Sequence, residues 1–137
     1  MKNLKLFFFT LSGIFLVMAV HAGIIEVEAG GDIRAAVRKA SPADTIMLKA
    51  GEYTLSTQIE QNKDIVLMGD KDNKPVVNFT NFVLGIEAKK LVLDGLHIIY
   101  DRKYLIYNAN EKEVDIDDIV FRNCIINLNG ENGASLI

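Results

Sequence analysis

An acidic run, "EVDIDD", offers carboxylates that could act as metal ligands. They belong to Glu113, Asp115, Asp117 and Asp118, and carboxylate oxygens are the ligands that Ca²⁺ prefers. The run lacks the glycine and the distal glutamate of a calcium-binding loop. Charge runs between strands are usually just solvated. The sequence therefore assigns no metal ligand here.

His97 stands among other side chains that could do acid–base chemistry. It alternates with Leu96 and Ile98, which predicts that it points outward. Its charged neighbours in the sequence would let it belong to a groove: Asp94, Asp101, Arg102 and Lys103. A surface histidine on a strand is more often inert, so the sequence names no catalytic residue.

Three tyrosines offer a different chemistry. Tyr100, Tyr104 and Tyr107 could form an aromatic platform for sugar rings, or they could pack between neighbouring elements. No Ser-His-Asp set, glycine-rich phosphate loop or zinc-ligand spacing occurs in the chain.

The composition indicates one domain with a real core. The chain has 137 residues, of which 50% are hydrophobic, and a net charge of −3. No cluster of Lys and Arg is interleaved with aromatic residues, which argues against a surface for nucleic acid.

Residues 1–22 are predicted to be a secretory signal peptide. Lys2 and Lys5 precede an apolar run from Leu6 to Val20, and the small residues Val20 and Ala22 suit cleavage after Ala22. The alternative is a membrane anchor, but the run is shorter than the roughly 20 residues that a spanning helix needs. We therefore expect a secreted, periplasmic or cell-surface bacterial protein without a stable membrane span.

Cys124 is the only cysteine, so no disulfide can form within the chain. It stands at an apolar position of the repeat described below. We therefore expect a small buried hydrophobic residue rather than a reactive thiol.

A short helix is predicted at "GGDIRAAVRKASPADT". Ile33, Ala36, Val37 and Ala40 share one face. Asp32 suits the N-cap, and Pro42 stops the helix.

From Thr45 onward, the chain reads as short strands that are cut by turn residues. They fall into four sets of three: "TIML", "EYTL" and "TQIEQ"; "DIVLMG", "PVVNF" and "FVLGIEA"; "KLVLDG", "LHIIY" and "YLIYNA"; "DIVFRN", "CIINL" and "ASLI". Repeats of about 20 to 30 residues are typical of a solenoid, here a three-sided one in which each triplet forms a coil. The helix would cap the first coil.

One inward column is predicted from equivalent central residues that advance by 19, 26 and 28 positions. Its members are Leu48, Leu67, Leu93 and Phe121. The matching tight turns carry residues that tolerate a left-handed conformation: Gly69, Gly95 and Asn123. An antiparallel β-sandwich also has short strands at regular spacing, but the repeat consists of triplets rather than hairpins.

The opening segment resembles right-handed parallel β-helix proteins of the pectate-lyase-like superfamily. The likeness rests on "IRAAVRKASPADTIMLKAGEYTL" and "KDIVLMGDKDNKPVV", in which these positions match: Pro42, Asp44, Thr45, Ile46, Leu48, Ala50, Gly51, Tyr53, Ile65, Leu67, Gly69, Pro75 and Val76. The later "LVLDGLHI" and "IVFRNCII" look like coils of chondroitinase-B-like lyases and of related Bacteroidetes β-helix domains.

The resemblance implies an all-β fold, a right-handed parallel β-helix of about four coils, and a polysaccharide partner, often a uronate-containing one. In such lyases, β-elimination needs a positive group, Ca²⁺ or Lys and Arg, on the uronate carboxylate, together with a base. Ca²⁺ is implied by the resemblance alone. Two hypotheses follow: an exported lyase-like enzyme, or a non-catalytic module that binds glycans or builds a cell-surface structure.

Residues 23–137 are expected to be the N-terminal part of a longer β-helix. "GASLI" leaves Leu136 and Ile137 at a third-strand position, without a polar capping element. Catalytic residues of the complete protein would then lie in later coils.

Overall fold

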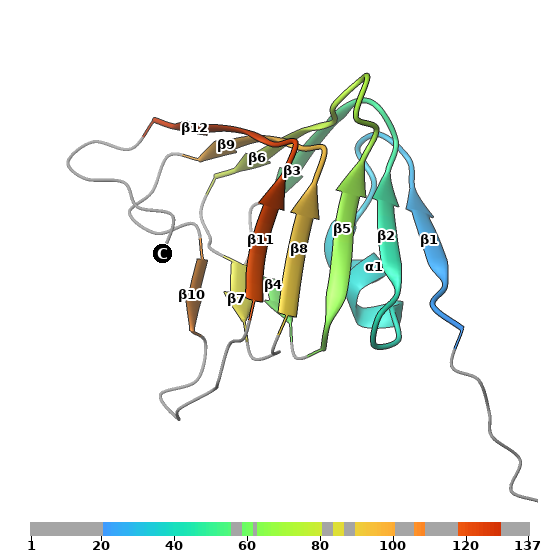
Figure 1. The fold of residues 1–137 in the computed structure, drawn as a ribbon. Coiled ribbons are helices and arrows are strands. Elements are labelled where there is room, and N and C mark those ends of the chain that lie inside the picture. The colour runs from blue at the N-terminus through green and yellow to red at the C-terminus, as the bar shows by residue number, and fades with distance from the viewer. Residues whose placement is uncertain are drawn as a thin grey trace, which may run out of the picture.

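The protein is a right-handed parallel β-helix (Figure 1). A computed structural model describes residues 21–55, 59–61, 63–80, 84–86, 90–100, 106–108 and 118–129. In chain order, the elements are β1 (Ile24–Val27), α1 (Ile33–Lys39), β2 (Thr45–Leu48), β3 (Glu52–Leu55), β4 (Ile59–Gln61), β5 (Ile65–Gly69), β6 (Val76–Phe79), β7 (Leu84–Ile86), β8 (Lys90–Asp94), β9 (His97–Tyr100), β10 (Ile106–Asn108), β11 (Asp118–Arg122) and β12 (Ile125–Leu128).

Each coil contributes one strand to each of three sheets. The first sheet has the order β1-β2-β5-β8-β11, the second β12-β9-β6-β3 and the third β10-β7-β4; we call them sheets A, B and C. Each of the nine strand pairs in the described part of the chain is parallel. The first three predicted triplets and the first two strands of the fourth are thereby confirmed, and the β-sandwich is excluded.

The described strands make three complete coils and two strands of a fourth. The third strand of that coil, predicted at "ASLI" with Leu136 and Ile137, lies outside the described residues, as do residues 1–20 of the predicted signal peptide. One strand was not predicted: β1 pairs with β2 and extends sheet A by one strand ahead of the first triplet.

The inward column of sheet A differs from the prediction by one member. Ile46 pairs with Leu67, Leu67 with Leu93, and Leu93 with Phe121. Leu48, which we expected in this column, is buried but pairs with Gly69 instead. The prediction was wrong by two residues, because Ile46 and Leu48 both point inward and both are apolar.

The last described coil is less enclosed than expected. Phe121 and Cys124 are only half-buried, although both pack against the core. The sulfur of Cys124 lies 3.4 Å from the carbonyl oxygen of Leu93 and 3.2 Å from that of Arg122. The predictions that Phe121 and Cys124 are buried were therefore wrong.

Sheet B closes the core from a second side. Val77 and Ile98 are fully buried and in register. Beside them, Phe79 and Tyr100 pack edge to face, with ring centroids 6.4 Å apart and an interplanar angle of 78°. The hydroxyl of Tyr53 lies 2.8 Å from the carbonyl oxygens of both Val27 and Lys49. This phenol is buried with its polar end satisfied, and burial raises its pKa.

Helix α1 closes the N-terminal end of the coils, as predicted. The Asp32 carboxylate accepts a hydrogen bond of 3.1 Å from the backbone N–H of Ala35. Ile33, Ala36 and Val37 are buried and join the core. The helix contacts β1 and β4, so it covers apolar side chains that the first coil would otherwise expose.

The tight corner between sheets A and B depends on backbone contact between coils. Gly95 has φ +69° and Asn123 has φ +52°, so the left-handed conformation expected there is confirmed for both. Gly69 has no positive φ; a side chain there would instead meet the ring of Pro75 at 2.4 Å and the carbonyl oxygen of Gly95 at 2.6 Å. Position 69 therefore needs glycine because Pro75 and the backbone of Gly95 lie too close for a side chain, and not because of its backbone conformation.

Gly95→Ala should destabilise the fold more than Gly30→Ala. Both glycines have a positive φ, so each change costs about 1 to 2 kcal/mol from the left-handed conformation. At Gly95 the new methyl group would also lie 2.8 Å from the carbonyl oxygen of Gly69, whereas nothing lies within 4 Å at Gly30. We expect this overpacking to add about 1 to 3 kcal/mol. Urea unfolding measures the difference, and equal losses would show that the coils do not touch there.

Candidate functional site

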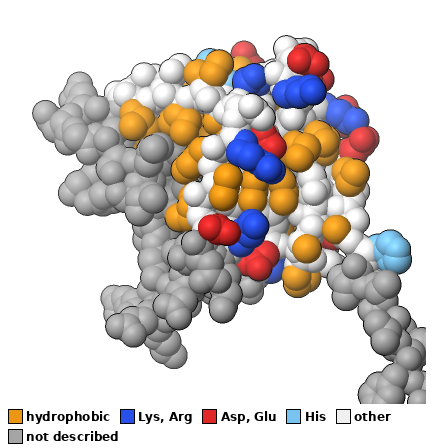
Figure 2. All heavy atoms as spheres, viewed as in Figure 1, with side chains coloured by type: hydrophobic (Ala, Val, Ile, Leu, Met, Phe, Trp, Pro, Cys, Tyr) orange, Lys and Arg blue, Asp and Glu red, His pale blue; other side chains and the backbone are white. Residues whose placement is uncertain are grey.

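The outer face of sheet A is apolar in its middle and charged at its ends. Thr45, Val66, Val92 and Val120 follow one another in register across four strands, and Figure 2 shows hydrophobic side chains in the middle of this face with charged ones above and below. Three ion pairs join charges on this face: Lys90 with Asp118 at 3.8 Å, Arg122 with Asp94 at 3.2 Å, and Lys49 with Glu26 at 2.7 Å.

The outer face of sheet B has a different character. Thr54, Asn78, Ile99 and Asn127 follow one another in register on β3, β6, β9 and β12. These positions point outward because their neighbours on each strand, such as Val77 and Ile98, fill the core. Three of the four are uncharged polar side chains at equivalent positions of successive coils.

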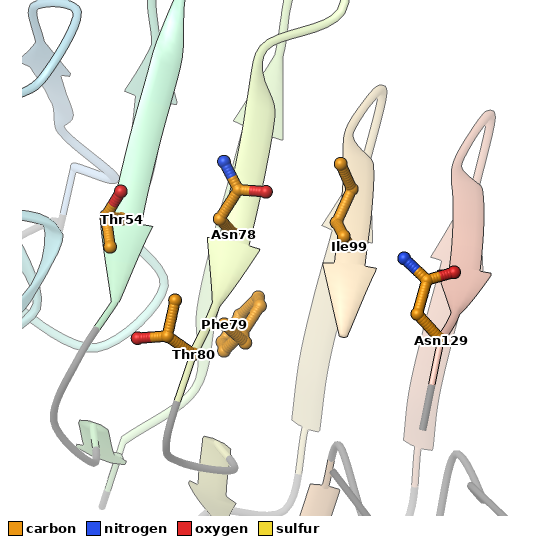
Figure 3. Close-up of a pocket in the computed structure, with 6 residues that line it drawn as sticks. All are labelled: Thr54, Asn78, Phe79, Thr80, Ile99 and Asn129. Atoms are coloured by element: carbon orange, nitrogen blue, oxygen red, sulfur yellow. The ribbon is translucent and has the colours of Figure 1, made fainter. Parts of the chain in front are cut away.

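A hollow of about 370 Å³ lies on this face. Its lining comes from β3, β6 and β9 and from the residues that directly follow β6 and β12: Thr54, Asn78, Phe79, Thr80, Ile99 and Asn129. Figure 3 shows them on four neighbouring segments. None of the six carries an ionisable group, so the hollow suits an uncharged part of a ligand. We call this surface, Asn127 included, the sheet B hollow.

The residues after the strands are anchored by the preceding coil. The backbone N–H of Thr80 donates to the carbonyl oxygen of Leu55 at 3.0 Å, and that of Asn129 donates to the carbonyl oxygen of Tyr100 at 2.7 Å. The same parallel pairing that builds the core therefore fixes the rim of the hollow.

His97 lies beside the hollow and is engaged by its neighbour. It points outward and is half-exposed, as predicted. Its Nε2 is 3.0 Å from the side-chain nitrogen of Asn127. The contact orients the His97 ring against the Asn127 amide, and the ring tautomer decides which of the two nitrogens donates.

Of the four residues predicted to form a groove with His97, the structure describes Asp94 alone. Asp94 lies on the outer face of sheet A, where Arg122 pairs with it and Asn123 donates to it at 3.0 Å. The other members named with His97, which are Asp101, Arg102 and Lys103, lie outside the described residues.

The structure describes one residue of the acidic run and two of the three tyrosines. Of the acidic run, Asp118 is exposed beside Lys90, while Glu113, Asp115 and Asp117 lie outside the described residues. Tyr100 is 1% exposed and inside the core, which for this residue decides the two alternatives in favour of packing. Tyr104 lies outside the described residues, and Tyr107 is in β10.

A second hollow, of about 380 Å³, lies at the edge of sheet A and is more charged. Two of its charged residues, Glu26 and Lys49, pair with each other, and this pairing raises the pKa of Lys49. Another lining carboxylate, Asp70, accepts hydrogen bonds from the backbone N–H groups of Asp72 and Asn73 in its own turn. These groups are engaged locally, which leaves the sheet B hollow as the better candidate.

Within the described ranges, no group of three or more His, Cys, Asp and Glu side chains is arranged to hold a metal ion. In the same ranges, no helix has the length and apolar character needed to cross a membrane.

The chain matches no protein family, no curated protein and no solved structure. The parallel β-helix is therefore shown by the structure alone. Membership of the pectate-lyase-like superfamily stays a resemblance of sequence.

Sequence reasoning missed the polar row of sheet B, although its signal is present. The second strands of the four coils read "EYTL", "VVNF", "HIIY" and "IINL" in the structure. The third letter of each is the outward one: Thr54, Asn78, Ile99 and Asn127. Comparing equivalent outward positions across coils would have found the row.

The neighbours Ile98 and Ile99 test which side of β9 faces the core. Ile98 is fully buried, whereas Ile99 lines the hollow. Ile98→Ala should lower the free energy of unfolding by about 2 to 5 kcal/mol. We expect Ile99→Ala to change it by less than about 1 kcal/mol, since it leaves no cavity in the core. Denaturant unfolding of both variants measures this, and the reverse order would mean that sheet B is turned inside out.

Proposed function

We propose that this is an exported protein that binds a polysaccharide on the sheet B hollow. The observation that carries the proposal is the row of uncharged polar side chains on successive coils, which lines a hollow without charge. The predicted signal peptide supports export, and the family resemblance supports a glycan as the partner.

The chemistry of the row suits sugar hydroxyls. A Thr hydroxyl and an Asn amide each offer both donors and acceptors, as a sugar hydroxyl does. Neighbouring strands are about 4.8 Å apart, so equivalent side chains repeat at a distance close to the length of one sugar residue. Ile99 adds an apolar patch on which the C–H face of a ring can lie.

Binding is better supported than elimination. Elimination on a uronate needs a cation against the carboxylate and a base near the C5 proton. The six residues that line the hollow include no Lys, Arg or carboxylate. His97, on the same face of β9 as Ile99, is in contact with the side-chain amide of Asn127. A lyase-like activity of a longer protein would need groups from other coils.

Thr54→Ala should weaken glycan binding, while Thr45→Ala should not. Both changes remove one outward hydroxyl from a strand, but Thr54 lines the hollow and Thr45 lies on the outer face of sheet A. Loss of one hydrogen bond of about 0.5 to 1.5 kcal/mol corresponds to a roughly two- to ten-fold rise in Kd. Affinity electrophoresis in gels containing neutral or uronate polysaccharides measures it.

Asn78→Ala should show a loss of the same order, because Asn78 lies in the middle of the row. The proposal fails if no polysaccharide retards the wild-type protein, or if the two Thr variants lose equal affinity. Appearance of the ultraviolet absorbance of an unsaturated uronate product would decide for the lyase instead.

A further inference from the structure

Gly23 is fixed on both sides although it precedes the first strand. Its backbone nitrogen donates to Oδ1 of Asp44 at 2.7 Å. Its carbonyl oxygen accepts from the backbone N–H of Thr45 at 2.8 Å. The register of β1 on β2 begins at the next residue, where Ile24 pairs with Thr45. Gly23 therefore enters the sheet at a defined place.

Asp44 is 8% exposed. Among the described residues it is the one charged side chain that is buried. Its second oxygen accepts a hydrogen bond of 2.7 Å from the backbone N–H of Ser41. The hydrogen bonds from Gly23 and then Ser41 lower the pKa of Asp44, with a smaller contribution from the charge of Lys63, while burial opposes the shift. Asp44 is consequently a carboxylate at neutral pH.

The peptide bond that is predicted to be cleaved contains the nitrogen atom of Gly23, which donates to Asp44. The sequence places the cut after Ala22, and the two residues before the cut, His21 and Ala22, are both exposed. Hydrolysis of that peptide bond gives the hydroxyl of water to the carbonyl carbon of Ala22 and a hydrogen to the nitrogen of Gly23. The new amine takes up a proton, since an α-amino group has a pKa of about 7.7 to 8.

We propose that removal of the leader creates a structural ion pair, in which the α-ammonium group of Gly23 binds the carboxylate of Asp44. Processing would then replace a hydrogen bond from a neutral amide to the carboxylate by one in which the donor is charged as well, which adds the attraction between two opposite charges. The inference rests on the predicted export signal and is independent of glycan binding.

The identity of residue 23 agrees with this arrangement. A Cβ atom at Gly23 would lie 3.2 Å from Oδ1 of Asp44, which is closer than ordinary van der Waals contact. With any other residue at this position, the Asp44 side chain would have to shift by a few tenths of an ångström. A glycine directly after the cut therefore lets the new terminus approach the acid.

The pair has a defined pH dependence. An anionic partner raises the pKa of the α-amine, by about one unit or more at this distance. A raised pKa means that the added stability is fully present below about pH 7.7, the ordinary value, and is lost as the pH rises through the raised value. Among the charged groups that the structure describes, Lys63 also acts on Asp44 through its charge.

The test compares the exported full chain with a form that carries one extra alanine between Ala22 and Gly23. Intact-mass measurement first confirms that the wild-type protein begins at Gly23 and the variant at the added alanine. The added residue moves the ammonium group away from Asp44 but keeps the Gly23 amide. We expect its Tm to be about 3 to 6 °C lower at pH 6, and equal to wild type at pH 10.

Asp44→Asn supplies the matched control. In that background the extra alanine should leave the Tm unchanged at both pH values, because the carboxylate is gone. Should Asp44→Asn fail to fold, the pH titration of the Gly23 Cα resonance in the processed wild-type protein reports the α-amine directly. A midpoint within the ordinary range, a terminus other than Gly23, or an equal Tm for both forms at pH 6 would overturn the proposal.

Discussion

The structure depends on parallel pairing between equivalent strands of successive coils. A strand in this fold has no hairpin partner, so its backbone N–H and C=O groups find their partners only in the coil before and the coil after it. That constraint sets the register, and the register decides which side chains meet. Ile46, Leu67, Leu93 and Phe121 form a column because their strands are held side by side.

The same register has a consequence outside the core. Side chains alternate along each strand, so an inward column on one side creates an outward row on the other. Sheet A carries an apolar row with paired charges at its ends, whereas sheet B carries uncharged amides and hydroxyls around a hollow. The outward residue at each equivalent position is mostly apolar in sheet A and mostly polar in sheet B. Repetition of these residues from coil to coil gives the two sheets different surfaces.

Most of the fold could be predicted from the sequence because turn residues separate the strands. Proline, glycine and polar clusters mark the corners, and the triplets between them match β2 to β12. The register of the first coil on the second could not be predicted from the sequence, because "TIML" has apolar residues at both inward positions, Ile46 and Leu48. Strand β1 was missed because "IIEV" stands before the helix and belongs to no triplet.

The site was harder to predict than the fold. Histidine and carboxylates are the usual candidates for a site in a sequence. Here Asp94 and Asp118 form ion pairs with Arg122 and Lys90 on sheet A. The residues that gather around the hollow are Thr and Asn, which are common in loops and become a site only through the register between coils. Tyr100 shows the converse, since its orientation into the core follows from its place two residues after Ile98.

The central claim is that the outward row of sheet B, and not that of sheet A, is the ligand surface. Nuclear magnetic resonance of the labelled protein during titration with the polysaccharide that binds it tests this most directly. The account predicts shifts of the side-chain amide signals of Asn78, Asn127 and Asn129, while the backbone signals of Thr45 and Val66 stay in place. Shifts confined to sheet A, with the three side-chain amides unchanged at saturation, would contradict it.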